Sequence, residues 1–162
     1  MNNKTKIAFV LFLLIIILSA VFAGIYLSRP QYMPYHAAAA GKSWAELDVR
    51  LQALILGFMR AAGGGWLAAS LALLFLLLIP FRQGAAWSRW AILIVGLALA
   101  VPTLYGTLLI KFKTPGSPPW YAPAVGIVLL IAGFSLSSGP RKKRKDDNLI
   151  VNFTKISGGR HD

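Results

Sequence analysis

Few residues in this chain belong to the types that carry out acid–base or metal chemistry. His36 is the only histidine apart from His161, and it lies in the segment Tyr32-Met33-Pro34-Tyr35-His36. A structural zinc site uses four ligands, and a copper site built from Met33 and His36 would have only two ligands in one loop. We therefore interpret His36 as a polar loop residue and expect no metal or other cofactor.

Carboxylates are equally scarce, and their positions favour structural roles. Glu46 and Asp48 are the only ones before the basic C-terminal segment. Ser43-Trp44-Ala45-Glu46 fits a capping box, and Asp48 would complement the dipole of a first helical turn. Membrane proteases and proton-coupled transporters instead place carboxylates inside apolar stretches. The chain also has no cysteine, which excludes thiol redox chemistry and iron–sulfur clusters. The sequence thus favours a non-enzymatic protein, and a membrane enzyme, the third hypothesis, would have to work with His36, Glu46, Asp48 or Tyr residues.

Arg60 is the charged residue that lies deepest in an apolar stretch. Extension of its side chain to the lipid headgroups is the simpler interpretation. The alternative is recognition of an anionic lipid or ligand, because a guanidinium group fits phosphate and carboxylate. Hydroxyls of Thr103, Tyr105 and Thr107 lie at a similar depth and would by default bond their own helix, but they could also line an outward-facing pocket. The candidate ligand-binding residues are Arg60, His36, Trp44, Tyr105 and Trp120, with Trp66 at the same depth.

Long apolar stretches must position these residues. Of the 162 residues, 57% are hydrophobic and 14% are charged, whereas a soluble domain has roughly a quarter charged residues. A bilayer core needs about 20 apolar residues in a helix. The sequence therefore predicts an all-α, integral membrane four-helix bundle with spans at about 7–27, 61–80, 90–110 and 120–138. The first stretch also resembles a signal peptide, but its length favours a retained span.

Residues 44–59, before the second span, are predicted to form an amphipathic helix. Apolar side chains from Leu47 to Phe58 recur at helical spacing on one face. The three glycines at 63–65 then weaken the helix. The segment either lies along the outer interface and bends at these glycines, which we favour, or projects straight out of the membrane.

Four small residues, Gly57, Ala61, Gly65 and Ala69, recur at every fourth position of the second span. This spacing lets another helix approach closely. Packing within the monomer is the first interpretation, and dimerisation is the second. The leading functional hypothesis is accordingly a non-enzymatic accessory or interaction protein, whose partners are the bilayer and a membrane protein or a second copy. The alternative is binding or transport of a lipid or small molecule through the pocket near Arg60.

The net charge of +12 is concentrated beside the apolar stretches. Seven of the 17 Lys and Arg residues follow Pro140, and five of these form the run Arg141–Lys145. Basic residues in such positions orient membrane helices and attract anionic lipid, so we do not expect nucleic-acid binding. We expect both termini in the cytoplasm, with 141–162 as a disordered tail. The layout resembles small four-helix proteins of bacterial inner membranes, including DoxX-like ones. This resemblance implies a bacterial inner-membrane location and carries over no functional residue.

Overall fold

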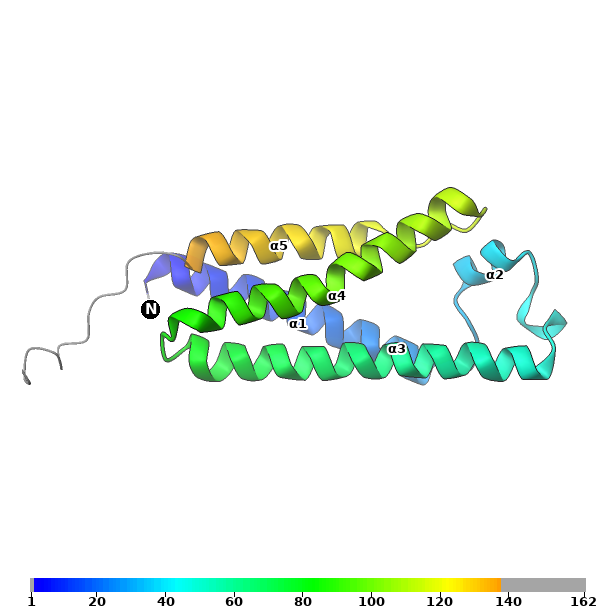
Figure 1. The fold of residues 1–162 in the computed structure, drawn as a ribbon, viewed down its shortest axis with the longest axis horizontal. Helices are drawn as coiled ribbons and strands as arrows, with labels where there is room; N and C mark the ends of the chain where they lie inside the picture. Colours follow the sequence, from blue (N-terminus) through cyan, green and yellow to red (C-terminus); the bar gives the residue numbers. More distant parts are fainter. Residues whose placement is uncertain (1, 138–162) are drawn as a thin grey trace, which may run out of the picture.

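The computed structural model describes residues 2–137, and all regular elements in this range are helical (Figure 1). The elements are α1 (Asn3–Ser28), α2 (Pro34–Ala40), the 3-10 turn η1 (Trp44–Glu46), α3 (Val49–Leu76), the π-helical turn η2 (Leu77–Phe81), α4 (Ala86–Lys113) and α5 (Tyr121–Ser137). The helices α1, α3, α4 and α5 run up and down beside one another, so α1 begins at the end where α5 finishes (Figure 1). We call this the N-terminal end, and the opposite end the α2 end. The predicted all-α class is confirmed.

Within residues 2–137, three segments are long and apolar enough to cross a membrane: α1, α3 continued by η2, and α4. The expected spans at 7–27, 61–80 and 90–110 lie within these segments. The expected span at 120–138 corresponds to α5, which has 17 residues and is therefore about 26 Å long. Residue 138 and the predicted tail at 141–162 lie outside the described residues.

The expected separate helix over 44–59 is wrong in its extent. Its first residues form only the turn η1, where the amide of Ser43 donates to the carboxylate of Glu46 as the capping box predicts. The cap of α3 is Asp48, whose side chain accepts a hydrogen bond from the amide of Arg50 at 2.8 Å. The helix α3 then passes through the glycines at 63–65 and stays straight (Figure 1). The favoured bend is absent because the helix hydrogen bonds continue and α1 packs along this stretch.

Prolines determine where helices end or change geometry. Pro80 lies inside η2, where the wider π-helical turn accommodates a residue that cannot donate a hydrogen bond. Gly84 then adopts a left-handed conformation, with φ of 86°. This reversal brings the amide of Ala85 within 2.9 Å of the Pro80 carbonyl oxygen and starts α4.

The N-terminal half of the molecule is tightly packed. Phe12 of α1 and Phe81 of η2 meet edge to face, with ring centroids 5.6 Å apart. Gly133 of α5 lies directly beside the Phe12 ring, and Gly96 of α4 lies beside Leu130 of α5. The other buried residues of this core include Ala8, Leu73, Leu77 and Ile92. Close approach at glycines gives the dispersion contacts that hold membrane helices together.

On α3, the glycine that packs against α1 is Gly63. A Cβ atom added to Gly63 would lie 3.1 Å from Cβ of Tyr26 and 3.2 Å from the carbonyl oxygen of Ala23. Cβ atoms added to Gly57 and Gly65 would meet no neighbouring atom within 4 Å among the described residues. The predicted stripe of Gly57, Ala61, Gly65 and Ala69 is therefore not the face that packs within the monomer, and that interpretation is wrong. Residues two positions apart point about 200° away from each other around a helix, so the stripe faces outward and dimerisation stays a prediction.

Alanine substitutions at two glycines of α3 separate these faces. Gly65→Ala should raise the free energy of unfolding by up to about 1 kcal/mol, since alanine is the better helix former. Gly63→Ala should lower it by about 1 kcal/mol or more, because the added methyl meets the α1 backbone. Denaturant titration of the purified protein in detergent measures both values. Equal effects of the two substitutions would contradict the packing described for Gly63.

Candidate ligand cavity

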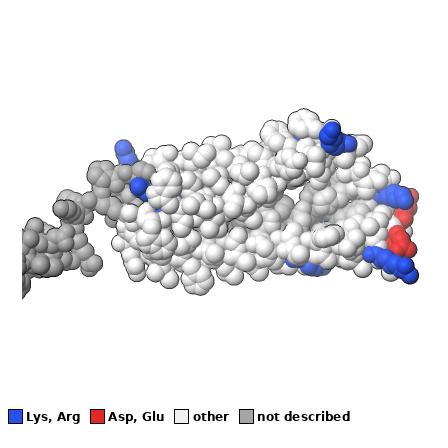
Figure 2. All heavy atoms as spheres, in the orientation of Figure 1, with Lys and Arg blue, Asp and Glu red and all other residues white. Residues whose placement is uncertain are grey.

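A cavity of about 530 Å³ lies between the helices in the half of the molecule nearer α2. Figure 2 shows the surface hollowed near the α2 end. Residues of α1, α2, α3, α4 and α5 line the cavity, and none of these lining residues is charged. The lining includes Ser19, Phe22 and Tyr26 of α1, Tyr35 of α2, Trp66 of α3, Thr103 and Thr107 of α4, and Gly126 of α5.

The course of α4 explains why this half is hollow. Its second half diverges from α3 (Figure 1), and Pro102 lies near the middle of the helix. Proline removes one backbone hydrogen bond and its ring pushes against the preceding turn, which kinks a helix. Thr103 donates to the carbonyl oxygen of Leu99 at 2.8 Å, and Thr107 donates to that of Leu104 at 2.9 Å. These bonds support the helix around the kink and turn the two hydroxyls toward their own backbone.

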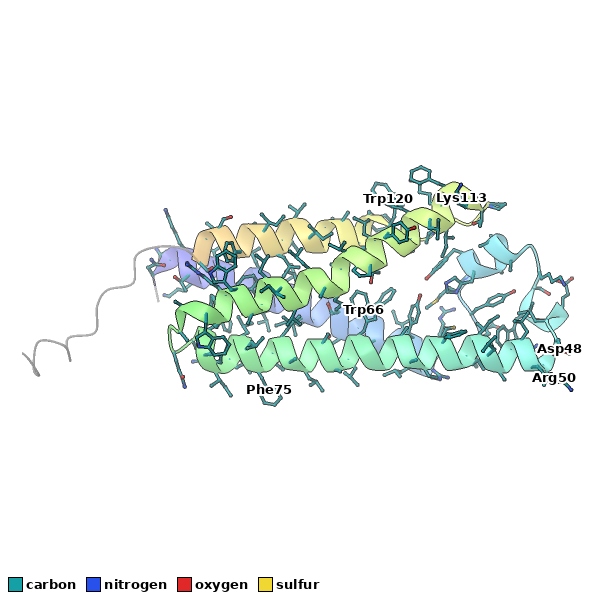
Figure 3. All side chains as sticks on the ribbon, in the orientation of Figure 1. Asp48, Arg50, Trp66, Phe75, Lys113 and Trp120 are labelled. Atoms are coloured by element: carbon teal, nitrogen blue, oxygen red, sulfur yellow. The ribbon has the colours of Figure 1, made fainter. Side chains whose placement is uncertain are left out.

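Three aromatic rings form one wall of the cavity. The ring of Phe22 stacks on Tyr26 with centroids 4.7 Å apart, and it lies 5.1 Å from the ring of Trp66. Figure 3 shows Trp66 extending from α3 into the space between the helices, whereas Phe75 points away from them. This wall offers a flat apolar surface that suits hydrocarbon or ring-shaped ligands.

Two tyrosine hydroxyls meet at the α2 side of the cavity. The hydroxyl oxygens of Tyr26 and Tyr35 are 2.8 Å apart. Pro34, the first residue of α2, starts the helix that carries Tyr35 over the end of α1. Burial, followed by the hydrogen bond with Tyr26, raises the pKa of Tyr35 well above its usual value. The Tyr35 hydroxyl is therefore neutral at physiological pH.

A second, smaller cavity of about 380 Å³ lies between α2 and α3 and shares Tyr26 and Ala62 with the larger one. His36 lines it, together with Tyr32 and Met59. The Nδ1 atom of His36 accepts a hydrogen bond from the amide of Met33 at 3.4 Å, and burial lowers the pKa of its imidazole. Within residues 2–137, no three metal-ligating His, Cys, Asp or Glu residues come together. His36 is therefore a neutral residue whose imidazole accepts a hydrogen bond at the N-terminus of α2.

Arg60 lines neither cavity and instead caps α1. Its Nη1 atom donates to the carbonyl oxygen of Tyr26 at 3.0 Å, and its Nη2 atom donates to that of Arg29 at 2.9 Å. The helical partner of the Tyr26 carbonyl would be the amide of residue 30, but Pro30 has no N–H group. Arg60 therefore supplies the hydrogen bond that proline removes.

The remaining candidate residues lie outside the larger cavity. The Trp44 ring packs edge to face on Tyr32, with centroids 5.0 Å apart. Tyr105 is 68% exposed on the outer face of α4. Trp120 lies at the outer surface (Figure 3), where the Nζ atom of Lys111 is 4.2 Å from its ring centroid. Of the residues expected near the pocket, the structure brings together Trp66 and two threonine hydroxyls, but not Arg60, Tyr105 or Trp120.

Sequence reasoning missed the α1 side of this cavity. Ser19 and Tyr26 are seven residues apart, so they share one face of the helix. An aromatic residue, Phe22, lies between them on the same face. This spacing was available as a signal, but it does not reveal which helix the face meets.

Substitution of Arg60 tests its role as a cap. Arg60→Leu should lower the free energy of unfolding by about 1–2 kcal/mol, because two carbonyl groups lose their donor. Arg60→Lys should recover part of this loss, since a single ammonium group cannot reproduce the fork of two donors. Thermal unfolding in detergent, followed by circular dichroism, measures the difference. An unchanged melting temperature in Arg60→Leu would contradict the capping role.

No protein-family model, curated protein or solved structure matches the chain.

Proposed function

We propose that the chain is a four-helix membrane protein that binds an apolar small molecule or lipid chain in the larger cavity. The observation that carries this proposal is an uncharged cavity of about 530 Å³ walled by aromatic side chains. Ligand-binding cavities are typically about 300–1,000 Å³ and mainly apolar, with a few polar groups. The lining contains hydroxyls but no carboxylate, imidazole or amine, which favours binding or transport over catalysis.

The distribution of charge supports a membrane location. Lysine, arginine and acidic side chains gather at the two ends, with an uncharged band between them (Figure 2). Large apolar side chains such as Ile17, Phe75 and Ile94 are exposed along that band. Such a surface is unfavourable in water but suits a bilayer core about 30 Å thick. The length of α5, about 26 Å, is compatible with a fourth span.

The proposed orientation places the N-terminal end in the cytoplasm of a bacterial cell. Among residues 2–137, that end carries Lys4, Lys6, Arg82 and Arg89, whereas the α2 end carries six Lys or Arg residues together with both acidic residues, which count little in orienting helices. The sequence after α5 therefore decides the orientation. The run Arg141–Lys145 follows α5 in the sequence and adds to the cytoplasmic charge. Since the chain has no cysteine, single cysteines placed at Asn3 and Ala45 should react with an impermeant maleimide from opposite sides.

An accessory role through self-association is the second candidate. The outward-facing stripe of Gly57, Ala61, Gly65 and Ala69 favours it, since Cβ atoms at both glycines would meet open space among the described residues. Native mass spectrometry from mild detergent distinguishes the candidates. A monomer with a retained small molecule supports the cavity, and a dimer without one supports self-association.

Quenching of Trp66 fluorescence tests ligand binding directly. The reporter is a variant that keeps Trp66 and has phenylalanine at Trp44, Trp87, Trp90 and Trp120, reconstituted in phosphatidylcholine nanodiscs. Brominated octadecanol, which quenches tryptophan on contact, should produce a saturable loss of fluorescence. This result is expected because Trp66 forms part of the cavity wall.

Two glycine substitutions provide the matched comparison. Gly126 lines the cavity and has open space at its Cβ position, so Gly126→Phe should fill the cavity and abolish saturable quenching. Gly106 also has open space but is not part of the lining, so Gly106→Phe should retain it. If the reporter variant shows no saturable quenching, or if both substitutions behave alike, the proposed binding function is wrong.

A further inference from the structure

Ser19 differs from every other serine and threonine in the described parts of the long helices. It is 6% exposed and lines the larger cavity. The other Ser and Thr residues of α1, α3, α4 and α5 each donate to an oxygen of their own helix or its cap. Within residues 2–137, the Ser19 hydroxyl makes no hydrogen bond. In an apolar medium a hydroxyl without a partner is costly, so the place of Ser19 in the cavity lining points to a ligand oxygen.

The tyrosine pair provides a second polar point in the same cavity. In the bond between Tyr26 and Tyr35, one hydroxyl donates and the other accepts. The accepting tyrosine keeps its own hydrogen available, so the pair always retains one free donor. Ser19 is seven residues from Tyr26, which places it about 10 Å deeper along α1. The cavity thus has one hydroxyl deep inside and one donor nearer α2.

The surroundings of Ser19 exclude a charged ligand group at that depth. None of the residues that line the cavity is charged, and Arg60 lies outside the lining with its guanidinium engaged with two backbone carbonyls. An ion transferred into such a place would lose its hydration without gaining a partner. A single-chain ionic amphiphile would keep its head outside and present only methylene groups to Ser19. The hydroxyl would then remain unsatisfied.

We propose that the ligand of this cavity is an uncharged lipid whose hydroxyl or carbonyl oxygen bonds the Ser19 hydroxyl, with its apolar body against the Phe22 and Trp66 rings. This inference rests on the proposed binding function and specifies the chemical class of the ligand. Serine suits either oxygen, because its hydroxyl both donates and accepts. The tyrosine pair would bond a second oxygen or a water molecule at the α2 side.

Substitution of Ser19 tests the predicted contact in the Trp66 reporter variant. Ser19→Ala removes only the hydroxyl oxygen and should weaken binding of brominated octadecanol by about twofold to tenfold, the range for one lost hydrogen bond. Ser70→Ala is the matched control, because Ser70 is 3% exposed, bonds the Trp66 carbonyl oxygen and lies outside the lining. It should leave the dissociation constant unchanged. Equal binding by Ser19→Ala and its parent would overturn the inference.

Competition with unlabelled amphiphiles tests whether the site selects an uncharged group. Octadecanol should displace the brominated probe. Octadecyl sulfate and octadecyltrimethylammonium, which are charged at all relevant pH values, should do so at least about tenfold more weakly because of the desolvation of charge. Equal displacement by all three overturns the inference but leaves apolar binding intact. Absence of saturable quenching in the parent would instead refute the proposed function itself.

Discussion

The structure depends on one constraint: in an apolar environment, each backbone amide and carbonyl must find a hydrogen-bond partner within the protein. Continuous helices meet this requirement along their length, so the difficulty falls on the prolines and the helix ends. At Pro30 the missing amide is replaced by the Arg60 guanidinium. At Pro80 the helix widens into the turn η2. Both features lie where a proline removes one backbone N–H group.

Two glycines and a proline divide the molecule into a packed half and a hollow half. Glycines at 96 and 133 allow α5 to approach α4 and α1 closely near the N-terminal end. Beyond Pro102, α4 departs from α3, and the aromatic rings of Phe22, Tyr26 and Trp66 occupy part of the widened space. The remaining space is the cavity. Its position at the α2 end results from where the kink lies in α4.

The sequence predicted the elements better than their contacts. Apolar stretches of adequate length identified the helices, and the capping box at Ser43 and Glu46 is present where it was predicted. The bend at the three glycines is wrong, because tertiary packing against α1 overrides their low helix propensity. The prediction that the stripe beginning at Gly57 packs within the monomer is wrong for a related reason. Spacing along one helix identifies a face, but it does not say which neighbour, if any, covers it.

For the candidate site, the sequence predicted how deep each residue lies along the membrane-spanning helices, but not the direction in which its side chain points. Depth counting brought Trp66, Thr103 and Thr107 together correctly, since these residues lie at similar heights on antiparallel helices. It also included Arg60, Tyr105 and Trp120, whose side chains point elsewhere. Ser19 was missed because a single serine in an apolar helix normally bonds its own backbone. Only the packed arrangement reveals that this one does not.

The uncharged lining of the cavity determines how it would respond to the electrical state of a membrane. A transmembrane voltage acts on charge, at about 2.3 kcal/mol per elementary charge for each 100 mV. Neither the side chains around the cavity nor a neutral occupant carries such a charge. A neutral molecule that binds there would therefore move no charge across the field, so its occupancy would follow its concentration in the lipid and its affinity rather than the voltage.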